Sequence, residues 1–566
     1  MPESVSIEPF GSVAADPRSG VSLSPGQAPP PGYYANNLRQ LAQFVAERYG
    51  AALDASSGAF VEALLELPEP ALRLYARLAG RKGTLFRLDS LRYSEVADID
   101  LALGALAHAG LVERQHSEPA DRLLALVKVP ELQSWFASSF AGRSRWRKQE
   151  RIARLLSDHT DQRLRQQLGR RMQWLTVTSA SALQRLQLLY FGGRHQDLSA
   201  FVTEDLGLIR YPQYEQSMPD WWDGSAAALA RHEQLHRCVS RSHGFSPDVD
   251  QSAYAQELAQ QLQSLPVSRE QAQVRDRALL RLGHYFERRS QPTAALNTYA
   301  PVQRHPARER RVRLLAKTGQ QGAADTLLEN IRRAPLCAAE ADFSERFGKR
   351  LPARHAMTEL SLIEATPPQI EHFAAQLLLH SGGSAWHVEN RLPLGIAGLL
   401  YWEVLFAPIP GAFTRPFQVA PNDLRWDDFT AVRSAALAQV EARWGGAAGA
   451  DSEALLQQMR CTIAQHQGIA NPLVSWQLFS DAFVKQLHSA LGAGVLARLA
   501  HFVIRQLGRY HNGFPDLLVL YPNGDFECVE VKGPGDQLQG AQRRWLDQLA
   551  EMNIPARVLK LRPRKQ

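Results

Sequence analysis

The sequence predicts a multidomain, mostly α-helical protein that ends in an α/β domain. Three observations carry this prediction. Apolar residues recur at helical spacing over most of the 566 residues. Two apolar runs of strand length flank a turn near the C-terminus. The chain is also long enough for several buried cores, because single cores stop growing beyond about 250–300 residues.

The composition narrows the class of protein. The four cysteines are scattered and form no Cys-x-x-Cys pair, so neither a zinc site nor a disulfide framework is expected. No uninterrupted apolar run reaches the length of a membrane span, so we expect no membrane partner. The formal net charge is +7, and arginine greatly outnumbers lysine. This basic balance is compatible with nucleic acid but does not establish it.

The N-terminal region is predicted to hold a tail and then helices. Residues 1–32 are rich in Pro, Gly and Ser and lack periodicity, which predicts a disordered tail. Apolar stripes predict helices from Tyr33 to about Ser117, with two short helices over 93–106 and a strand at 111–112. Helix, turn, helix and strand resemble a winged-helix module. A helical bundle without nucleic-acid contact is the open alternative.

A basic turn follows between two predicted helices in residues 130–156. Its cations are Arg143, Arg145, Arg147 and Lys148, with Trp146 among them. Clustered cations beside an aromatic ring are typical of phosphate contact, although a charge run is more often only a solvated face. The pair of helices resembles a SAP-type module that lies on a DNA backbone. Residues 33–160 are therefore predicted to form a helical winged-helix/SAP-like DNA-binding region.

Residues 161–366 are predicted to form helices joined by short breaks. The patterns at 279–296 and 312–328 each predict a helical hairpin, and small residues stand where the helices would cross. Such paired helices resemble tetratricopeptide repeats, so this middle region is interpreted as TPR-like. Five arginines lie between the hairpins: Arg304, Arg308, Arg310, Arg311 and Arg313. They either follow DNA or pack against neighbouring acids.

Residues 367–566 are predicted to form an α/β domain with a long helical insertion. One apolar helix is expected from about Leu394 through Phe406, and most of the region to Gly508 has helical periodicity. The turn at 522–525 then separates two apolar runs, which predicts a β-hairpin. A helix beginning near Leu538 and a late strand at 557–561 follow.

The hairpin carries the residues with the clearest chemistry. Asp516 opens its first strand, and Glu530 and Lys532 close its second. Residues two apart share a face of a strand, so Glu530 and Lys532 point together while Val531 points into the core. Two carboxylates and an ammonium suit a hard divalent cation and a phosphate. Gln542, on the helix that follows, is placed to bind water or phosphate, unless it is only a surface residue.

The simpler explanation of the hairpin is a solvated edge. A Glu-x-Lys triplet alone should occur by chance roughly once or twice in a chain of this length, given average charge content. The joint pattern of acid, apolar run, turn, apolar run, Glu-Val-Lys and helix is rarer. It favours hydrolysis of a phosphodiester, which needs a metal held by oxygen ligands, an activated water and stabilised charge on the phosphorus.

The motifs together resemble a known family. Pro515-Asp516 followed by Glu530-Val-Lys532 resembles the PD-(D/E)xK nuclease superfamily. With Glu389-Asn390 and the apolar helix after it, the region resembles the VRR-NUC nuclease domain. The order of regions along most of the chain is similar to that of the Fanconi-associated nuclease family.

The resemblance implies a metal-dependent, structure-selective DNA nuclease. Such enzymes cut 5′ flaps of branched double-stranded DNA, digest it in the 5′ to 3′ direction and act in repair of interstrand crosslinks. It implies Mg²⁺ or Mn²⁺ held by Glu389, Asp516, Glu530 and the carbonyl of Val531. It also implies that Lys532 is the catalytic lysine and that Gln542 is a supporting polar group.

The resemblance has limits. Eukaryotic members carry a ubiquitin-binding zinc finger, and this chain has no Cys/His cluster, so a bacterial member acting in the cytoplasm at the nucleoid is expected. A eukaryotic member would be nuclear. The large helical part favours a monomer on one flap. A Holliday-junction-type resolvase and a non-catalytic DNA-binding repair scaffold are the competing functions, and the complete set of acids and lysine argues against the scaffold.

Overall fold

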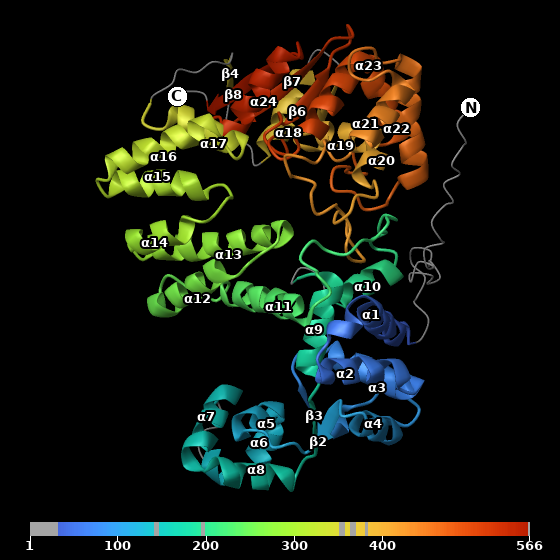
Figure 1. Cartoon of the computed structure of the whole chain (residues 1–566), viewed down its shortest axis with the longest axis vertical. Coiled ribbons are helices and arrows are strands. Elements are labelled where there is room, and N and C mark those ends of the chain that lie inside the picture. Colours follow the sequence, from blue (N-terminus) through green and yellow to red (C-terminus); the bar gives the residue numbers. More distant parts are fainter. Residues whose placement is uncertain are drawn as a thin grey trace, which may run out of the picture. The chain divides into compact units, whose positions relative to one another are not determined.

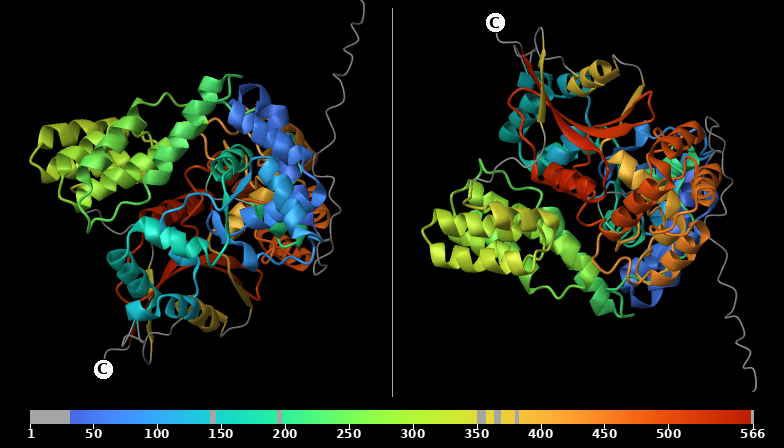
Figure 2. Two further views of the ribbon diagram at one scale, coloured as in Figure 1. Left: turned by 90° about the horizontal axis from the view of Figure 1, so that it is seen from below. Right: turned by 90° about the horizontal axis from the view of Figure 1, so that it is seen from above.

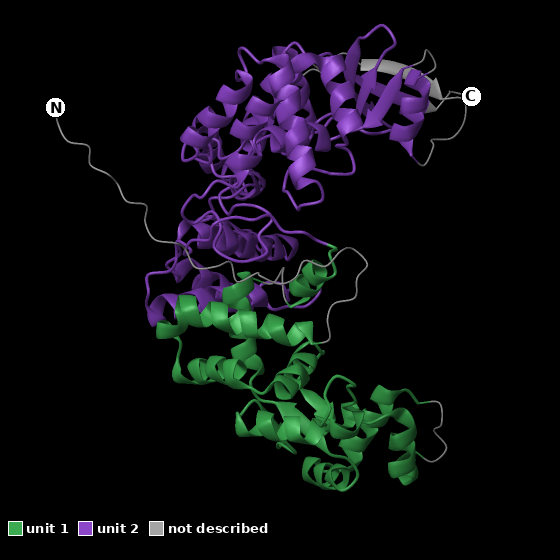
Figure 3. Ribbon diagram, turned by 90° about the vertical axis from the view of Figure 1, so that its right-hand side faces the viewer, with its two compact units in different colours: residues 1–208 green, residues 209–566 purple. Residues whose placement is uncertain are grey.

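The computed structural model describes residues 32–140, 146–193, 198–349, 357–362, 369–379 and 383–563 (Figure 1). The predicted tail therefore lies almost wholly outside the described residues. The chain divides into two compact units, Met1–Leu208 and Ile209–Gln566 (Figure 3). The sequence interpretation instead divides the folded chain after residues 160 and 366.

Unit 1 opens with helices around a small sheet. The helices are α1 (Tyr33–Tyr49), α2 (Ala55–Glu66), α3 (Glu69–Ala79) and α4 (Ile99–His108). The antiparallel sheet has the order β1-β3-β2, with β1 at Leu85–Arg87, β2 at Val112–Arg114 and β3 at Trp174–Val177. The expected helices and the strand near residue 112 are present. Two expectations are wrong: α4 is the single α-helix of the described 93–108 stretch, and the central strand β3 was expected to be helical.

Helices precede and follow the basic turn in the sequence, as predicted, and residues 141–145 of the turn lie outside the described residues. Four short helices, α5 (Ala120–Leu126), α6 (Val129–Trp135), α7 (Lys148–Asp158) and α8 (Asp161–Gly169), share an apolar core. The core contains Leu123, Leu132, Leu155 and Leu164, which are buried. Helices α9 (Ala180–Phe191) and α10 (Ser199–Asp205) complete the unit, and the ring of Tyr190 packs edge-on against Phe44 of α1.

Unit 2 begins with paired helices at the predicted positions. They are α11 (Ala226–Arg241), α12 (Ser252–Ser264), α13 (Arg269–Arg288), α14 (Pro292–Tyr299), α15 (Ala307–Lys317), α16 (Gln321–Arg333) and α17 (Ala338–Arg346). Close packing explains the small residue at the α13–α14 crossing, because a Cβ on Gly283 would lie 2.2 Å from the ring of Tyr299. Three of the five arginines pair with acids, as the packing alternative expects: Arg308 with Glu340, Arg310 with Glu287 and Arg313 with Glu309.

A five-stranded sheet follows, in the order β4-β8-β7-β6-β5. Its strands are β4 (Met357–Leu362), β5 (Ser384–His387), β6 (Leu517–Leu520), β7 (Phe526–Lys532) and β8 (Ala556–Pro563). The β6–β7 hairpin and the late strand β8 are confirmed, whereas β4 and β5 were not predicted. Parallel pairing joins β4, β8 and β7, and antiparallel pairing joins β7, β6 and β5.

Helices cover both faces of this sheet (Figure 2). Helix α18 (Ile370–Leu378) packs Ala374 against Val529 and Val531 on one face. Helix α24 (Gly540–Glu551) packs Trp545 on the other, in the same core as Cys528. The alternation of strand β7 therefore sends Glu530 and Lys532 to the α24 side, with Val531 in the opposite core as predicted.

The insertion between β5 and β6 is helical. It contains α19 (Arg391–Leu400), α20 (Trp402–Leu405), α21 (Ser434–Trp444), α22 (Ser452–His466) and α23 (Asp481–Arg505). The single helix expected from 394 to 406 is interrupted at Tyr401. In the part of the chain that the structure describes, α23 alone has the length and apolar composition of a membrane span. Half of its most apolar stretch is buried inside the protein, as in a core helix.

Candidate active site

The hairpin brings together the residues that the sequence singled out. Leu517 pairs with Val529 across the antiparallel ladder, so Asp516 comes opposite Glu530. The backbone N–H of Val531 donates to Asp516 Oδ2 at 2.9 Å. Lys532 Nζ lies 2.8 Å from Glu530 Oε1. One acid from β6 and the Glu-Val-Lys unit of β7 thus form one cluster at the end of the sheet.

Glu389 reaches this cluster from the end of β5. The backbone N–H groups of Val388 and Glu389 both donate to the Asp516 carbonyl oxygen, at 2.8 and 3.1 Å. Asn390 Oδ1 accepts a hydrogen bond from Phe514 N at 3.1 Å, which fixes the segment just before Asp516. Glu389 itself has a positive φ of 37°, an uncommon conformation for a residue with a Cβ. The surrounding hydrogen bonds hold this strained turn beside Asp516.

Burial dominates the electrostatics of the two hairpin acids. Burial raises the pKa of Glu530 to about 7, the charge of Asp516 adds to this effect, and Lys532 opposes it. Burial also raises the pKa of Asp516, while the hydrogen bond from Val531 N opposes the rise. The charge of Glu389 contributes to both shifts. Mutual repulsion of buried carboxylates is the condition that a bound cation relieves.

The Glu530 carboxylate is left short of partners. Its side chain is 1% exposed. In the described structure the Lys532 ammonium, 2.8 Å from Oε1, is the partner of this carboxylate, and Oε2 has no hydrogen-bond partner. A buried, unsatisfied carboxylate costs free energy, and a site with such an atom fits a cation that supplies the missing contact.

The three carboxylates suit a divalent metal, although in the described structure their side chains do not converge on a single point. Glu389, Asp516 and Glu530 offer carboxylate oxygens, the ligands that Mg²⁺ and Mn²⁺ prefer. Within the described ranges, no three His, Cys, Asp or Glu side chains converge as they are placed. Instead Asp516 accepts from Val531 N, and Glu389 Oε1 accepts from Asn390 Nδ2 at 3.2 Å. The Glu389 side chain is exposed and its charge acts on both other acids. The ligand role of Glu389 and the carbonyl role of Val531 stay predictions.

Gln542 has a structural task in this arrangement. It lies in the first turn of α24, and its Oε1 accepts from Gln539 N at 2.9 Å, which caps the helix. The cap positions the amide near the start of the helix that covers the site. Its contact with water or phosphate stays a prediction.

The predicted phosphate-binding cluster is described in part. Arg143 and Arg145 lie outside the described residues. The Arg147 side chain is exposed at the start of α7. Lys148 is half-buried, its ammonium donates to the Ala125 carbonyl, and burial lowers its pKa. Of the two described cations, Arg147 is therefore the better placed for a phosphate.

Two further charged residues stand near the site. Glu371, half-buried on α18, is one of the charges that raise the pKa of Asp516. Lys560 of β8 is the register partner of Lys532. No motif marked Glu371. Lys560 did leave a signal, because a lysine stands between apolar residues in the predicted late strand.

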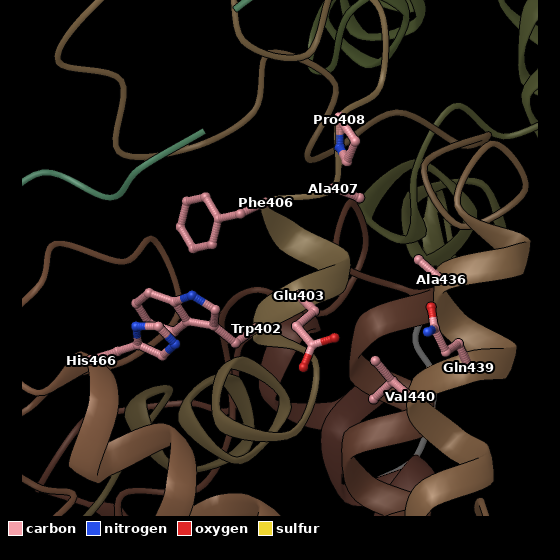
Figure 4. Close-up of a pocket in the computed structure, with 9 residues that line it drawn as sticks. All are labelled: Trp402, Glu403, Phe406, Ala407, Pro408, Ala436, Gln439, Val440 and His466. Carbon is pink, nitrogen blue, oxygen red and sulfur yellow. The ribbon is translucent and has the colours of Figure 1, made fainter. Parts of the chain in front are cut away.

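A separate cavity of about 420 Å³ lies in the helical insertion (Figure 4). The His466 ring stacks on Trp402 with centroids 4.2 Å apart, and Arg443 pairs with Glu403 at the wall. Burial lowers the pKa of His466. None of the residues predicted for metal binding or catalysis lines this cavity.

Two family models match this chain. Residues 451–563 match the model of the VRR-NUC domain, and residues 32–113 match that of the FAN1 HTH domain. The first match includes Asp516, Glu530 and Lys532 but leaves out Glu389. The second covers the helices and the strand that the sequence likened to a winged helix.

Similarity extends over nearly the whole chain. A Fanconi-associated nuclease 1 homolog of Pseudomonas aeruginosa is 30% identical, over 94% of this chain and 96% of the relative. A homolog from Arabidopsis thaliana is 26% identical, over 94% of this chain and 67% of its own. The crystal structure of paFAN1 bound to DNA with a 2-nucleotide 5′ flap and a gap superimposes with a TM-score of 0.83, at 29% identity over 95% of this chain and all of that one. An identity of this size over both whole chains, with the hairpin cluster inside the matched nuclease domain, places the chain in the Fanconi-associated nuclease family.

Proposed function

We propose that this DNA nuclease cuts branched duplexes at 5′ flaps, digests 5′ to 3′, and acts in interstrand crosslink repair with Mg²⁺ or Mn²⁺. The buried, unsatisfied Glu530 carboxylate beside Asp516 and Lys532 carries the proposal. It is supported by the resemblance over the full length to a protein whose crystal structure holds 5′-flap DNA. Family membership itself makes the chain a phosphodiester hydrolase that depends on a divalent metal.

Each residue has a role in the proposed reaction. Glu389, Asp516, Glu530 and the Val531 carbonyl would hold the cation, which lowers the pKa of a bound water and offsets charge on the phosphate. Lys532 directs its ammonium to the same place and stabilises negative charge on a phosphate oxygen as the bond to the leaving group lengthens. The Val531 N–H keeps the Asp516 carboxylate in place. Gln542 orients water or phosphate from the start of α24.

The decisive experiment compares DNA structures and variants. Labelled 5′-flap, 3′-flap and four-way-junction DNA are incubated with Mn²⁺, Mg²⁺ or EDTA, using wild type, Asp516→Ala, Lys532→Ala and a control, Asp525→Ala. Asp525 is an exposed acid of the same hairpin whose carboxylate contacts Asn523. We expect metal-dependent cutting near the flap by wild type and the control only.

The outcomes separate the competing functions. Activity that survives EDTA or both active-site substitutions contradicts the mechanism. Symmetric nicking of the four-way junction in preference to flaps identifies a resolvase. Tight binding of flap DNA without any cleavage identifies a scaffold.

We also propose that the enzyme acts as a monomer on DNA, in the cytoplasm of a bacterium at the nucleoid and without a ubiquitin-binding finger. One nuclease cluster per chain is sufficient for one cut at one flap. Sedimentation of the protein with flap DNA in EDTA should give one protein per DNA. Two proteins per flap at concentrations near the dissociation constant would contradict this proposal.

A further inference from the structure

Two lysines lie side by side on the sheet that carries the active site. Strands β7 and β8 are parallel, and Lys532 and Lys560 are register partners. Residues directly opposite each other in a ladder point to the same face, so both side chains belong to the α24 face. Lys532 is 9% exposed and Lys560 is 7% exposed. Two ammonium groups in neighbouring buried positions repel each other, and this repulsion is screened little by solvent.

The two ammonium groups have different partners. Lys532 Nζ lies 2.8 Å from Glu530. The contact of Lys560 is a main-chain carbonyl: its Nζ donates to the oxygen of Asp536. Asp536 belongs to the turn that follows Lys532, and its carboxylate accepts from Gly533 N at 3.0 Å. Lys560 therefore ties down the turn immediately after Lys532 while its charge stays beside the Lys532 side chain.

We propose that Lys560 is a positioning residue for the cleavage step and acts through Lys532. The Lys560 charge disfavours conformations in which the Lys532 ammonium points toward β8. The Lys532 ammonium therefore stays directed at Glu530 and the phosphate. The bond of Lys560 to the Asp536 carbonyl keeps Lys560 from competing for that phosphate. The inference rests on the proposed nuclease function and adds a residue outside the Asp-Glu-Lys motif.

A purely structural role is the alternative to be tested. The bond from Lys560 to the Asp536 carbonyl could serve stability alone. The alternatives predict different relations between rate and stability. A structural role lowers the cleavage rate only together with the stability of the fold, whereas a positioning role lowers the rate without a matching loss of stability.

The experiment uses the full chain and flap DNA. Lys560→Met removes the charge and the donor while keeping an unbranched side chain, and Lys560→Arg keeps both. For each variant the single-turnover rate constant is measured at saturating enzyme, the dissociation constant in EDTA, and the melting temperature.

A positioning role predicts a specific pattern. Lys560→Met should slow the single-turnover step roughly ten- to a hundredfold, the scale expected for a small misplacement of a catalytic group. Its dissociation constant and melting temperature should not worsen, and Lys560→Arg should recover much of the rate. Added to Lys532→Ala, Lys560→Met should cause no further loss, because a residue acting through Lys532 has nothing left to position.

Several results would overturn the inference. Unchanged cleavage by Lys560→Met contradicts the inference, and a loss of rate in Lys560→Met that is matched by a loss of stability identifies a structural role. Weaker DNA binding with an intact saturating rate makes Lys560 a phosphate contact instead. A misfolded Lys560→Met protein, recognised by circular dichroism, also indicates a structural role unless Lys560→Gln folds and shows the rate loss. If the wild type cuts no DNA, both the proposed function and the inference are contradicted. If wild type and Lys560→Met are equally active, only the inference is contradicted.

Discussion

At the scale of single residues, the active site is a place where folding and catalysis conflict. Glu530 is buried next to a second acid, and in the described structure Oε1 of its carboxylate has the Lys532 ammonium while Oε2 has no hydrogen-bond partner. A core residue chosen for stability alone would not be ionisable there. Burial of these carboxylates costs free energy of folding. A bound cation would offset this cost, so the strain of the metal-free site adds to the free energy of metal binding.

The first prediction concerns pH and stability without metal. The folded pKa of Glu530 is about 7, above its ordinary value of 4.5. The stabilisation that comes from protonated Glu530 is therefore fully present below about pH 4.5 and is lost as the pH rises through 7. Glu530→Gln does not titrate at this position. In EDTA its melting temperature should therefore rise relative to that of wild type as the pH increases from about 5 to about 8. A difference that stays constant over this range would show that Glu530 ionises normally.

The second prediction concerns metal binding. Mn²⁺ that binds only the folded protein should stabilise wild type by about 2.7 kcal/mol at a hundred times its dissociation constant. Asp516→Ala and Glu530→Gln should lose most of this gain, and Asp525→Ala should keep it. Differential scanning calorimetry without DNA measures the effect independently of catalysis. Equal stabilisation of all four proteins would place the metal elsewhere.

At the scale of elements, local signals decided what the sequence could predict. The β6–β7 hairpin and α24 were predictable because a Pro-Asn-Gly-Asp turn and a helical repeat are encoded within a few residues. Strands β4 and β5 were missed because they pair with β8 and β6, which are distant in sequence. The break at Tyr401 was missed because the apolar pattern continues through it.

The same distinction applies to the site. Asp516, Glu530 and Lys532 share one hairpin, and their proximity follows from strand alternation. Glu389 was named through resemblance alone, because its closeness to Asp516 depends on main-chain bonds between segments far apart in the chain. Glu371 was not named, since an exposed-face acid near a helix start is ordinary.

The third prediction tests the packing of the insertion. A Cβ on Gly395 of α19 would lie 1.9 Å from the Phe479 ring, so Gly395→Ala should destabilise unit 2 by about 1–3 kcal/mol. Gly322 of α16 has open space around its Cβ position, and Gly322→Ala should be neutral or slightly stabilising. Urea unfolding of both variants checks this. Equal stability of Gly395→Ala and wild type would mean that Phe479 moves away at little cost.

At the scale of the whole molecule, the residues predicted to contact DNA and those predicted to cut it belong to different units. The exposed Arg147 is in unit 1, and the hairpin cluster is in unit 2. A basic patch contributes sequence-independent affinity through phosphates, whereas the carboxylates decide the rate. Binding and cleavage should therefore be separable by substitution.

The fourth prediction follows from this division. Arg147→Ala should weaken flap binding, and the slope of log affinity against log salt should fall by about one for each lost phosphate contact. Its single-turnover rate at saturating protein should equal that of wild type. Lys148→Ala should change the slope less, because its ammonium is engaged by Ala125. Fluorescence anisotropy over a salt series measures both, and an unchanged slope for Arg147→Ala would exclude this patch from the DNA path.

The main-chain bonds from Val388 and Glu389 to the Asp516 carbonyl make the enzyme divisible. These bonds and the β5–β6 ladder align Glu389 with the β6–β7 hairpin. The alignment therefore does not depend on an unbroken chain through the insertion. The loop between α21 and α22 contains two consecutive glycines with positive φ, Gly445 and Gly446, and is a natural place for a chain break. We expect two separately produced fragments, joined there by a dimerising tag, to cut flap DNA only when assembled, because α21 and α22 must also rebuild their shared core.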